Sequence, residues 1–310
     1  MAKDFGKVAV LMGGHSAERE ISLISGQAVL ASLQASGVDA FAFDPATQPI
    51  WTLPELQVDR VFNILHGGAG EDGTVQGALD LLGIPYTGSG VLASALAMDK
   101  VRTKQVWEAT GIPTPRSLRV NAASQAADII ADLGLPLIVK PVREGSSIGL
   151  TKVTAAGELA AAIATAARRP DGQREEVMAE EFVAGTELTA AVLGRRVLPL
   201  IRIEPPAAGY DYQNKYFTDA VKYHCPAGIP ADQEAAIAHT VLAAFDALGC
   251  RGWGRADLML RSDGRYALLE MNTNPGMTGH SLVPMAARAA GLGFDALVLD
   301  ILAGAQRGQG

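Results

Sequence analysis

The stretch RADLMLRSDGRYALLEMN, residues 255–272, has the pattern of a β-hairpin. Two runs of strand-forming residues, 257–260 and 266–271, lie on either side of Asp263-Gly264. Asp-Gly favours a two-residue type I′ turn, because both of its residues tolerate a positive φ. We therefore expect the two runs to pair as antiparallel strands.

The turn fixes which residues face one another across the hairpin. Counting back from a two-residue turn places Asp257 opposite Glu270 and sets Leu258 and Leu269 as an apolar pair on the other face. Cross-strand partners have Cβ atoms roughly 4.5 to 5.5 Å apart, and like charges at that distance destabilise a sheet unless something neutralises them. A divalent cation between the two carboxylates would do so.

The same count places Arg255 opposite Asn272, again on the polar face. Two carboxylates and one amide oxygen, with room left for water and phosphate oxygens, form the ligand set expected of Mg²⁺ serving a nucleotide. The sequence therefore predicts a metal site at Asp257, Glu270 and Asn272. The alternative is a solvent-facing hairpin with ordinary acidic residues, which spacing alone does not reject.

Two features after the hairpin favour a ligand site. The polar turn 272–276 follows the second strand at once, where backbone N–H groups can approach a ligand and Gly276 permits close contact. Ser281 then precedes a helical pattern with Pro284 in its first turn. This predicts a helix start that can bind an anion.

Short apolar runs alternate with helical patterns in the first hundred residues. The runs 8–12 and 61–65 read as buried strands, and helical patterns follow them at 21–33 and 75–82. This alternation is typical of βαβ units and predicts a parallel sheet.

The turn after the first strand ends in Ser16, which is a good helix N-cap residue. Glu18 then falls in the first helical turn, where the helix dipole favours an anion. Glu18 therefore has a structural role that needs no ligand.

Two further units are expected after a boundary near Ala97, so that the chain divides into residues 1–97, 98–186 and 187–310. The second unit has two strand-like runs, at 137–140 and 177–182. Between them lie a loop rich in glycine and serine, at 143–149, and a helical pattern at 155–167. In the third unit, residues 205–226 fit no single period, and such a long irregular segment is more often a lid or binding loop than a connector.

The second unit also carries a pattern suited to a nucleotide. Lys140 ends a strand beside the glycine-rich loop 143–149, an arrangement that suits phosphates although it is not a Walker A sequence. The strand end Glu180-Glu181-Phe182-Val183, with Glu187 nearby, suits the adenine and ribose of a nucleotide. An edge strand with solvated acids explains the same residues equally well.

Composition limits the class of protein. The chain has 310 residues, 19% of them charged, and a formal net charge of −7 spread along it, which does not support a nucleic-acid-binding face. Cys225 and Cys250 lack metal-ligand spacing, which favours unpaired thiols in a reducing compartment. The apolar run 8–12 is too short for a signal peptide or a membrane span. We expect a cytoplasmic protein.

Taken together, the motifs resemble those of the D-alanine:D-alanine ligase family of the ATP-grasp superfamily along essentially the whole chain. The residues that carry this resemblance lie at 13–20, 66–74, 86–90, 98–100, 143–149, 215–216, 252–257 and 270–278. The resemblance implies an α/β protein with an N-terminal Rossmann-like parallel domain, followed by a two-part ATP-grasp fold of the α+β type that holds ATP between its parts.

The resemblance also implies which residues would bind Mg²⁺ and which would bind ATP. Mg²⁺, as two ions for which Mn²⁺ can substitute, would bind Asp257, Glu270 and Asn272. ATP would contact the residues Lys100, Lys140, Ser147, Glu180, Phe182, Val183 and Glu187, with the first two on phosphates and Glu187 on the ribose.

Substrate positions follow in the same way. The ammonium of the first D-alanine would lie at Glu18, supported by Ser146 and Tyr216, with His66 nearby. The carboxylate of the second would be held by Lys215, Ser281 and the Leu282 N–H. Arg255 and the Gly276 N–H would stabilise the tetrahedral oxyanion, and the lid would protect the reaction from water.

The implied reaction joins two D-alanine molecules through a D-alanyl phosphate, forming ADP, phosphate and a dipeptide for peptidoglycan synthesis. Relatives are commonly homodimers, and neither a nucleic acid nor a membrane is implied as a partner. Two alternatives remain: an ATP-grasp ligase with another second substrate, such as D-lactate, and a non-catalytic nucleotide-binding module.

Overall fold

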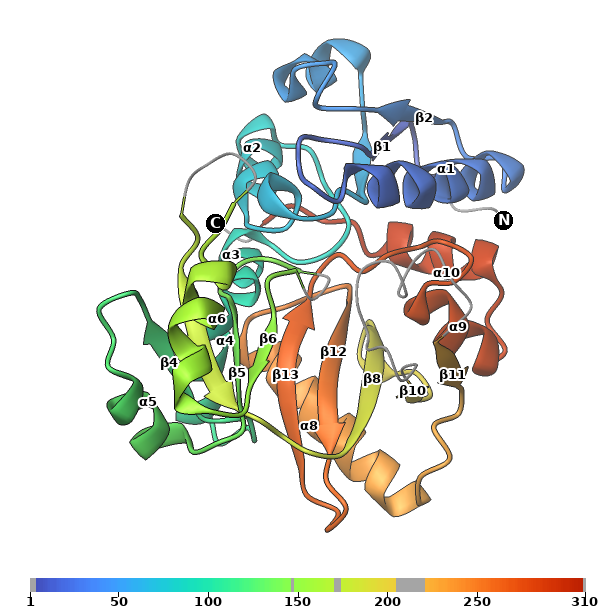
Figure 1. The fold of residues 1–310 in the computed structure, drawn as a ribbon. Coiled ribbons are helices and arrows are strands. Elements are labelled where there is room, and N and C mark those ends of the chain that lie inside the picture. Colours follow the sequence, from blue (N-terminus) through green and yellow to red (C-terminus); the bar gives the residue numbers. More distant parts are fainter. Residues whose placement is uncertain (1–3, 146–147, 170–173, 205–220, 309–310) are drawn as a thin grey trace.

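A computed structural model describes residues 4–145, 148–169, 174–204 and 221–308 (Figure 1). Within these residues the strands form three sheets, in the orders β2-β1-β3, β4-β7-β5-β6 and β11-β10-β8-β12-β13, with β9 paired to β8. Ser146, Ser147, Lys215, Tyr216 and most of the predicted lid lie outside the described residues.

The N-terminal sheet is parallel, as the alternating pattern predicts. β1 (Val8–Leu11) lies between β2 (Ala40–Phe43) and β3 (Arg60–Asn63). Its helices are α1 (Arg19–Ala35) and α2 (Thr74–Leu82), with short 3₁₀ turns at Ile50–Leu56 and Gly68–Gly70. The β2 strand was not anticipated, because four residues after a helix give little periodicity to detect.

The expected N-cap at Ser16 is wrong. The helix α1 begins at Arg19, and Glu18 is its N-cap residue without a side-chain cap bond. The Ser16 hydroxyl donates to the His66 carbonyl oxygen and accepts from the Glu18 N–H at 3.2 Å. Because Ser16 bridges to the loop after β3, it orders the turn that carries Glu18 instead of capping the helix.

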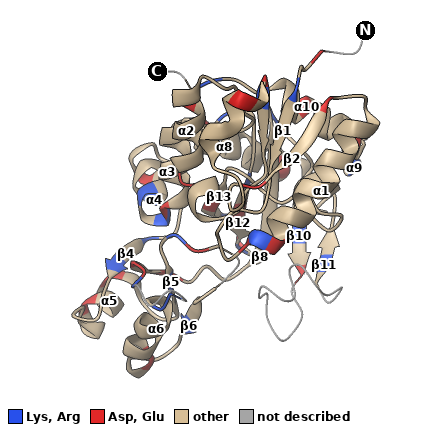
Figure 2. Cartoon of the chain, turned by 90° about the horizontal axis from the view of Figure 1, so that it is seen from above, with Lys and Arg blue, Asp and Glu red and all other residues tan. Residues whose placement is uncertain are grey.

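The central sheet is antiparallel and projects from the rest of the molecule (Figure 2). Its strands and helices are β4 (Ser117–Val120), α5 (Ala126–Leu133), β5 (Leu137–Pro141), β6 (Thr151–Val153), a 3₁₀ turn (Ala156–Glu158), α6 (Leu159–Ala166) and β7 (Val177–Glu181). These bounds confirm the strands and the helix expected in this region.

The C-terminal sheet is the largest, and helices cover both of its faces. Its strands are β8 (Thr186–Leu193), β9 (Arg196–Val197), β10 (Ile201–Glu204), β11 (Lys222–His224), β12 (Trp253–Leu260) and β13 (Tyr266–Asn272). The helices that pack on it are α3 (Val91–Met98), α4 (Lys100–Ala109), α8 (Ala231–Ala247), α9 (Leu282–Ala289) and α10 (Phe294–Ala303).

Alternation along β8 explains these two layers. Leu188, Ala190 and Val192 are buried with α3, α4 and α8, whereas Ala191 and Leu193 are buried on the other face with α9, α10 and the N-terminal sheet. The fully buried Trp107 of α4 donates its indole N–H to the Ala244 carbonyl of α8 at 3.2 Å. The helix that precedes the central sheet in sequence is therefore anchored in the core of the C-terminal sheet.

Charged residues of both signs are interspersed over the elements in Figure 2. Both cysteines are unpaired, as expected from their number and spacing. In the described part of the chain, no single helix is long and apolar enough to cross a membrane, and only the sharply bent pair α9 and α10 passes on length and composition together.

Candidate active site

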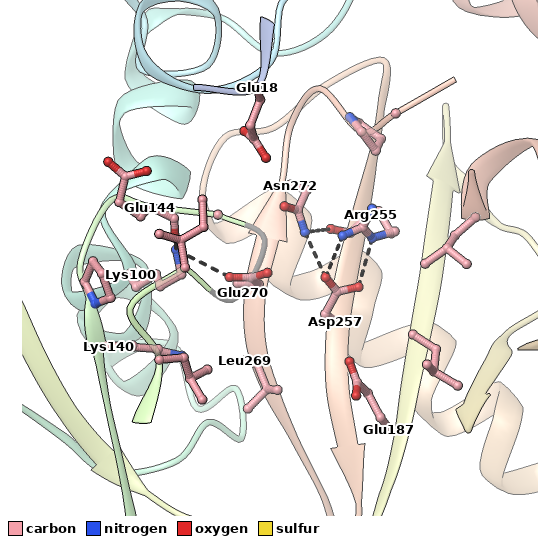
Figure 3. A pocket seen from close by; sticks show the side chains of 18 of the residues that line it. Glu18, Lys100, Lys140, Glu144, Glu187, Arg255, Asp257, Leu269, Glu270 and Asn272 are labelled. Carbon is pink, nitrogen blue, oxygen red and sulfur yellow. Dashed lines mark hydrogen bonds and ion pairs between the residues drawn. The ribbon is translucent and has the colours of Figure 1, made fainter. Parts of the chain in front are cut away.

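A cavity of about 420 Å³ lies where the three sheets meet. Acidic and basic side chains from all three enter it: Glu18 from the start of α1, Lys140 from β5, Glu187 from β8, Asp257 from β12 and Glu270 from β13 (Figure 3). Among the residues that the structure describes, the predicted site residues outside the hairpin thus line the same cavity as those within it.

The hairpin places the predicted residues opposite one another, although the turn differs from the prediction. Arg261 pairs with Arg265, so that the turn has three residues, Ser262, Asp263 and Gly264, and Gly264 has a φ of +84°. A turn one residue longer shifts the register near the tip, and Leu258 pairs with Leu268. The expected pairing of Leu258 with Leu269 is therefore wrong.

A β-bulge restores the predicted register further along. Leu269 is the extra residue of β13, and beyond it Asp257 faces Glu270 and Arg255 faces Asn272. In a regular strand, adjacent residues point to opposite faces, but at this bulge Leu269 and Glu270 both line the cavity. The bulge therefore sets an apolar surface beside a carboxylate on one wall.

The facing carboxylates are balanced by cations of the protein. Arg255 donates to both oxygens of Asp257, at 2.9 and 2.7 Å, and the Asn272 amide donates to Oδ2 at 3.1 Å. Lys100 lies 3.5 Å from the Glu270 carboxylate and donates to the Glu144 carbonyl at 2.8 Å. These contacts, drawn in Figure 3, relieve the like-charge repulsion expected from the sequence.

This donor set fits Mg²⁺ bound together with phosphate. Across the described residues, no group of three or more His, Cys, Asp or Glu side chains is arranged to hold a metal by itself. Mg²⁺ in nucleotide sites commonly uses one or two carboxylates and takes its remaining ligands from phosphate and water. Asp257 and Glu270, with the amide oxygen of Asn272, supply hard oxygen atoms of that kind.

At the opposite end of the cavity, a buried carboxylate is shared by two lysines. Glu180 is 4% exposed, and its oxygens lie 2.5 Å from the Lys140 ammonium and 3.1 Å from that of Lys104. Both lysines hold the pKa of Glu180 below its usual value, against the effect of its burial, which is the largest single influence and raises it. Phe182 and Val183 line the cavity next to this cluster.

Sequence reasoning missed Lys104, although its position gave a signal. It lies three residues before Trp107 and three after Val101, both of which are buried, so it falls on the inward stripe of α4. A lysine on an apolar stripe needs a buried partner. The sequence alone did not name Glu180 as that partner, because the two residues are far apart in the chain.

The cavity wall near Glu18 holds two further titratable groups. His66 contacts the Asn274 carbonyl at 3.0 Å and the Ser25 hydroxyl at 3.3 Å, and burial lowers its pKa. Glu71, a residue of the 66–74 loop that sequence reasoning left unassigned, accepts from the Gly67 N–H at 2.9 Å. Desolvation and the nearby Glu18 carboxylate raise the pKa of Glu71 to about 8.

The remaining wall is the start of α9. Ser281 is the N-cap residue, which confirms the predicted helix start, and its hydroxyl accepts from the Thr278 N–H at 2.9 Å. A Cβ atom added to Gly276 would lie 2.9 Å from the Ser281 hydroxyl. A side chain at this position would therefore displace the Ser281 hydroxyl, and Gly276, Ser281 and Leu282 all line the cavity.

Comparison with known families matches both parts of the chain. Residues 106–303 match a family described as the D-ala D-ala ligase C-terminus, and residues 48–89 match the D-ala D-ala ligase N-terminus. A curated D-alanine–D-alanine ligase from Aromatoleum aromaticum is 63% identical over 304 residues, covering 98% of this chain and 97% of that protein.

Solved structures agree with the fold. The D-alanine–D-alanine ligase from Bacillus anthracis is 33% identical, with a TM-score of 0.84 and 96% of each chain covered. A structure of the D-alanine–D-alanine ligase from Bacillus anthracis complexed with ATP is 32% identical, with a TM-score of 0.82 and 96% of each chain covered. The VanG D-Ala:D-Ser ligase from Enterococcus faecalis is 33% identical, with a TM-score of 0.82, covering 96% of this chain and 98% of that one.

The raised pKa of Glu71 predicts a pH-dependent stability difference. The folded protein retains a proton on Glu71 that the unfolded chain releases above about pH 4.5, so this residue costs stability as the pH rises towards 8. Glu71→Gln keeps the shape without the charge. We expect wild type and Glu71→Gln to have similar free energies of unfolding in urea near pH 5. At pH 8 we expect the variant to be more stable than wild type by at least about 1 kcal/mol. A difference that stays constant with pH would contradict this.

Proposed function

The chain belongs to the D-alanine–D-alanine ligase family, and we propose on that premise that it binds ATP, phosphorylates the carboxylate of one D-alanine, and joins the acyl group to the amine of a second. The products are D-alanyl-D-alanine, ADP and phosphate. The observation that carries the proposal is the match to curated ligases over almost the whole chain, at 63% identity.

The chemistry needs the nucleotide because a free carboxylate is a poor acylating agent. Transfer of the γ-phosphoryl group converts it into an acyl phosphate, from which phosphate leaves readily when the amine attacks. We assign the nucleotide to the side of the cavity formed by Lys140, Glu180, Phe182, Val183 and Glu187. Support for this comes from the apolar surface of Leu269 beside these polar groups, and from the ATP complex of the Bacillus anthracis ligase.

For the phosphates we assign Lys100 and Lys140, and for Mg²⁺ the oxygens of Asp257, Glu270 and Asn272. When bound, Mg²⁺ neutralises phosphate charge and aligns the γ-phosphoryl group for transfer. The 3.5 Å contact between Lys100 and Glu270 supports this assignment, because it holds a cation and a carboxylate side by side where phosphate and metal are both needed.

The first D-alanine is assigned to the wall that includes Glu18 and His66, with the Glu18 carboxylate on its ammonium group. Arg255 and the Gly276 N–H are assigned to the oxyanion of the tetrahedral intermediate. Removing one such fixed donor commonly lowers kcat by about 100-fold or more. Arg255 is suited to this role, because its bidentate contact with Asp257 fixes the guanidinium in one orientation.

The carboxylate of the second D-alanine is assigned to Ser281 and the Leu282 N–H. The support is electrostatic, since the N-terminus of α9 offers backbone donors and the positive end of its dipole. The roles assigned by resemblance to Ser146, Ser147, Lys215 and Tyr216 fall outside the described residues and stay predictions. We further propose that the protein is a cytoplasmic homodimer, and sedimentation at micromolar concentration should give twice the chain mass of 32.3 kDa.

A substrate panel tests the proposed function. Release of ADP and phosphate is measured with D-alanine alone, with D-alanine plus D-lactate or D-serine, and with L-amino acids, and the product is identified by mass. We expect ATP turnover with D-alanine alone and D-alanyl-D-alanine as the product.

D-serine belongs in the panel because a D-Ala:D-Ser ligase is about as similar in structure as the Bacillus anthracis enzyme. If turnover requires D-serine or D-lactate, that compound and not D-alanine is the second substrate. ATP binding without turnover on any substrate would favour the nucleotide-binding module.

The metal assignment predicts a large effect of Glu270→Gln. We expect kcat/KM for ATP to fall at least 100-fold, with a partial recovery at high Mg²⁺, because one of two facing carboxylates is lost. The melting temperature should change little, since Lys100 keeps its hydrogen bond to the Glu144 carbonyl and the amide oxygen of the variant can still accept from it. Asp263→Asn, at the exposed tip of the same hairpin, is the matched control and should keep wild-type activity. Near-normal activity of Glu270→Gln at low Mg²⁺ would contradict the assignment.

A further inference from the structure

Lys104 is one of the most deeply buried charged residues of the chain, with 1% of its surface exposed. It lies on α4, whose first residue is Lys100 and whose C-terminal part is anchored by Trp107 in the core of the C-terminal sheet. Burial of an ammonium group costs several kcal/mol unless partners compensate it. The partners of Lys104 therefore show what the residue holds in place.

On one side, Lys104 contacts the central sheet. Its ammonium lies 3.1 Å from Oε2 of Glu180, while Lys140 of β5 occupies Oε1 of the same carboxylate. Lys140 alone would leave the carboxylate free to rotate about a single ion pair. With one cation on each oxygen, Glu180 and Lys140 are both fixed at the cavity wall.

On the other side, Lys104 is connected to the C-terminal sheet. It donates to the Thr114 hydroxyl at 2.8 Å, and that hydroxyl donates to the Leu268 carbonyl at 2.8 Å. The Leu268 N–H donates to the Pro113 carbonyl at 2.8 Å. Leu268 immediately precedes the bulge residue Leu269, so this connection reaches the opposite wall of the nucleotide side of the cavity.

We propose that Lys104 is a positioning residue for ATP, which sets the spacing between the Glu180–Lys140 wall and the Leu269 wall of the nucleotide site. It touches neither the reacting atoms nor the substrate side of the cavity. The proposal rests on the assignment of ATP to this cavity and deepens it, because it identifies what holds the two walls in register before the nucleotide arrives.

The charge balance around Lys104 supplies a second means of testing. Desolvation lowers its pKa to about 8; Glu180 and Glu108 raise the pKa, and the neighbouring Lys140 lowers it. Above this pH the ammonium loses its proton and Glu180 keeps only one cation. Nucleotide affinity should therefore weaken as the pH rises through 8.

The test compares wild type with Lys104→Met, which has similar length and no charge. We expect the KM for ATP, and the dissociation constant for ATP measured by calorimetry without D-alanine, to rise about tenfold, while the KM for D-alanine changes less than twofold. The weakening of ATP binding above pH 8 should be smaller in Lys104→Met than in wild type. Glu71→Gln, which removes the other cavity group with a pKa of about 8, should retain the part that Lys104 causes. Arg102→Met, an exposed position on the same helix, removes an equal charge and should leave all of these values unchanged.

An unchanged affinity for ATP, or equal increases in both KM values, would overturn the proposal. If a thermal melt shows that Lys104→Met does not fold, two other measurements test the role of Lys104: the pH dependence of ATP affinity in wild type, and the ATP affinity of Thr114→Val. Thr114→Val removes the hydroxyl that joins Lys104 to Leu268 but leaves the ion pair of Lys104 with Glu180, and it should raise the ATP dissociation constant about threefold. A flat wild-type profile would overturn the proposal. A wild type that binds ATP as described but joins no D-alanine would leave this inference standing and refute the proposed function instead.

Discussion

Pairing of buried charges is the constraint on which the cavity depends. Asp257 is held by Arg255, Glu270 lies beside Lys100, and Glu180 is shared by Lys140 and Lys104. An unpaired charge as deeply buried as Glu180 or Lys104 would cost several kcal/mol, a large part of the 5 to 15 kcal/mol that stabilises a typical protein. The pairs also join separate elements of the fold. Lys104 connects α4 to Glu180 of the central sheet, and Lys100 connects α4 to Glu270 of the C-terminal hairpin.

Two irregular features of the backbone position charged groups of the cavity. The bulge at Leu269 turns two successive side chains into the cavity, and the turn at Ser16 bridges to the loop after β3 and holds Glu18 at the start of α1. Both place polar groups where regular secondary structure would direct them elsewhere. The site therefore lies at irregularities of the fold, whereas the regular strands and helices around it supply the packed core.

The sequence predicted the parallel N-terminal sheet and the central strands, because their apolar runs are short and clearly bounded. It predicted the facing pairs Asp257–Glu270 and Arg255–Asn272 only because two errors cancelled: the turn is one residue longer than Asp-Gly suggests, and the bulge adds one residue back. Neither feature has a local signal. Lys104 escaped notice for a different reason, since its partner Glu180 is 76 positions away in sequence and only the tertiary fold brings the two together.

The lengths of the ion pairs indicate how a protein of net charge −7 accommodates a polyanion. Arg255 and Asp257 form a bidentate contact at 2.9 and 2.7 Å, which fixes both groups, whereas Lys100 and Glu270 are 3.5 Å apart and make a looser contact. On the assignments proposed above, a phosphate oxygen would replace Glu270 as the partner of Lys100, while Glu270 would gain the cation that arrives with the nucleotide. Each charge would then exchange one partner for another instead of losing one, so binding would avoid the cost of stripping water from an isolated charge. Local pairing, and not the sign of the total charge, determines what this cavity can bind.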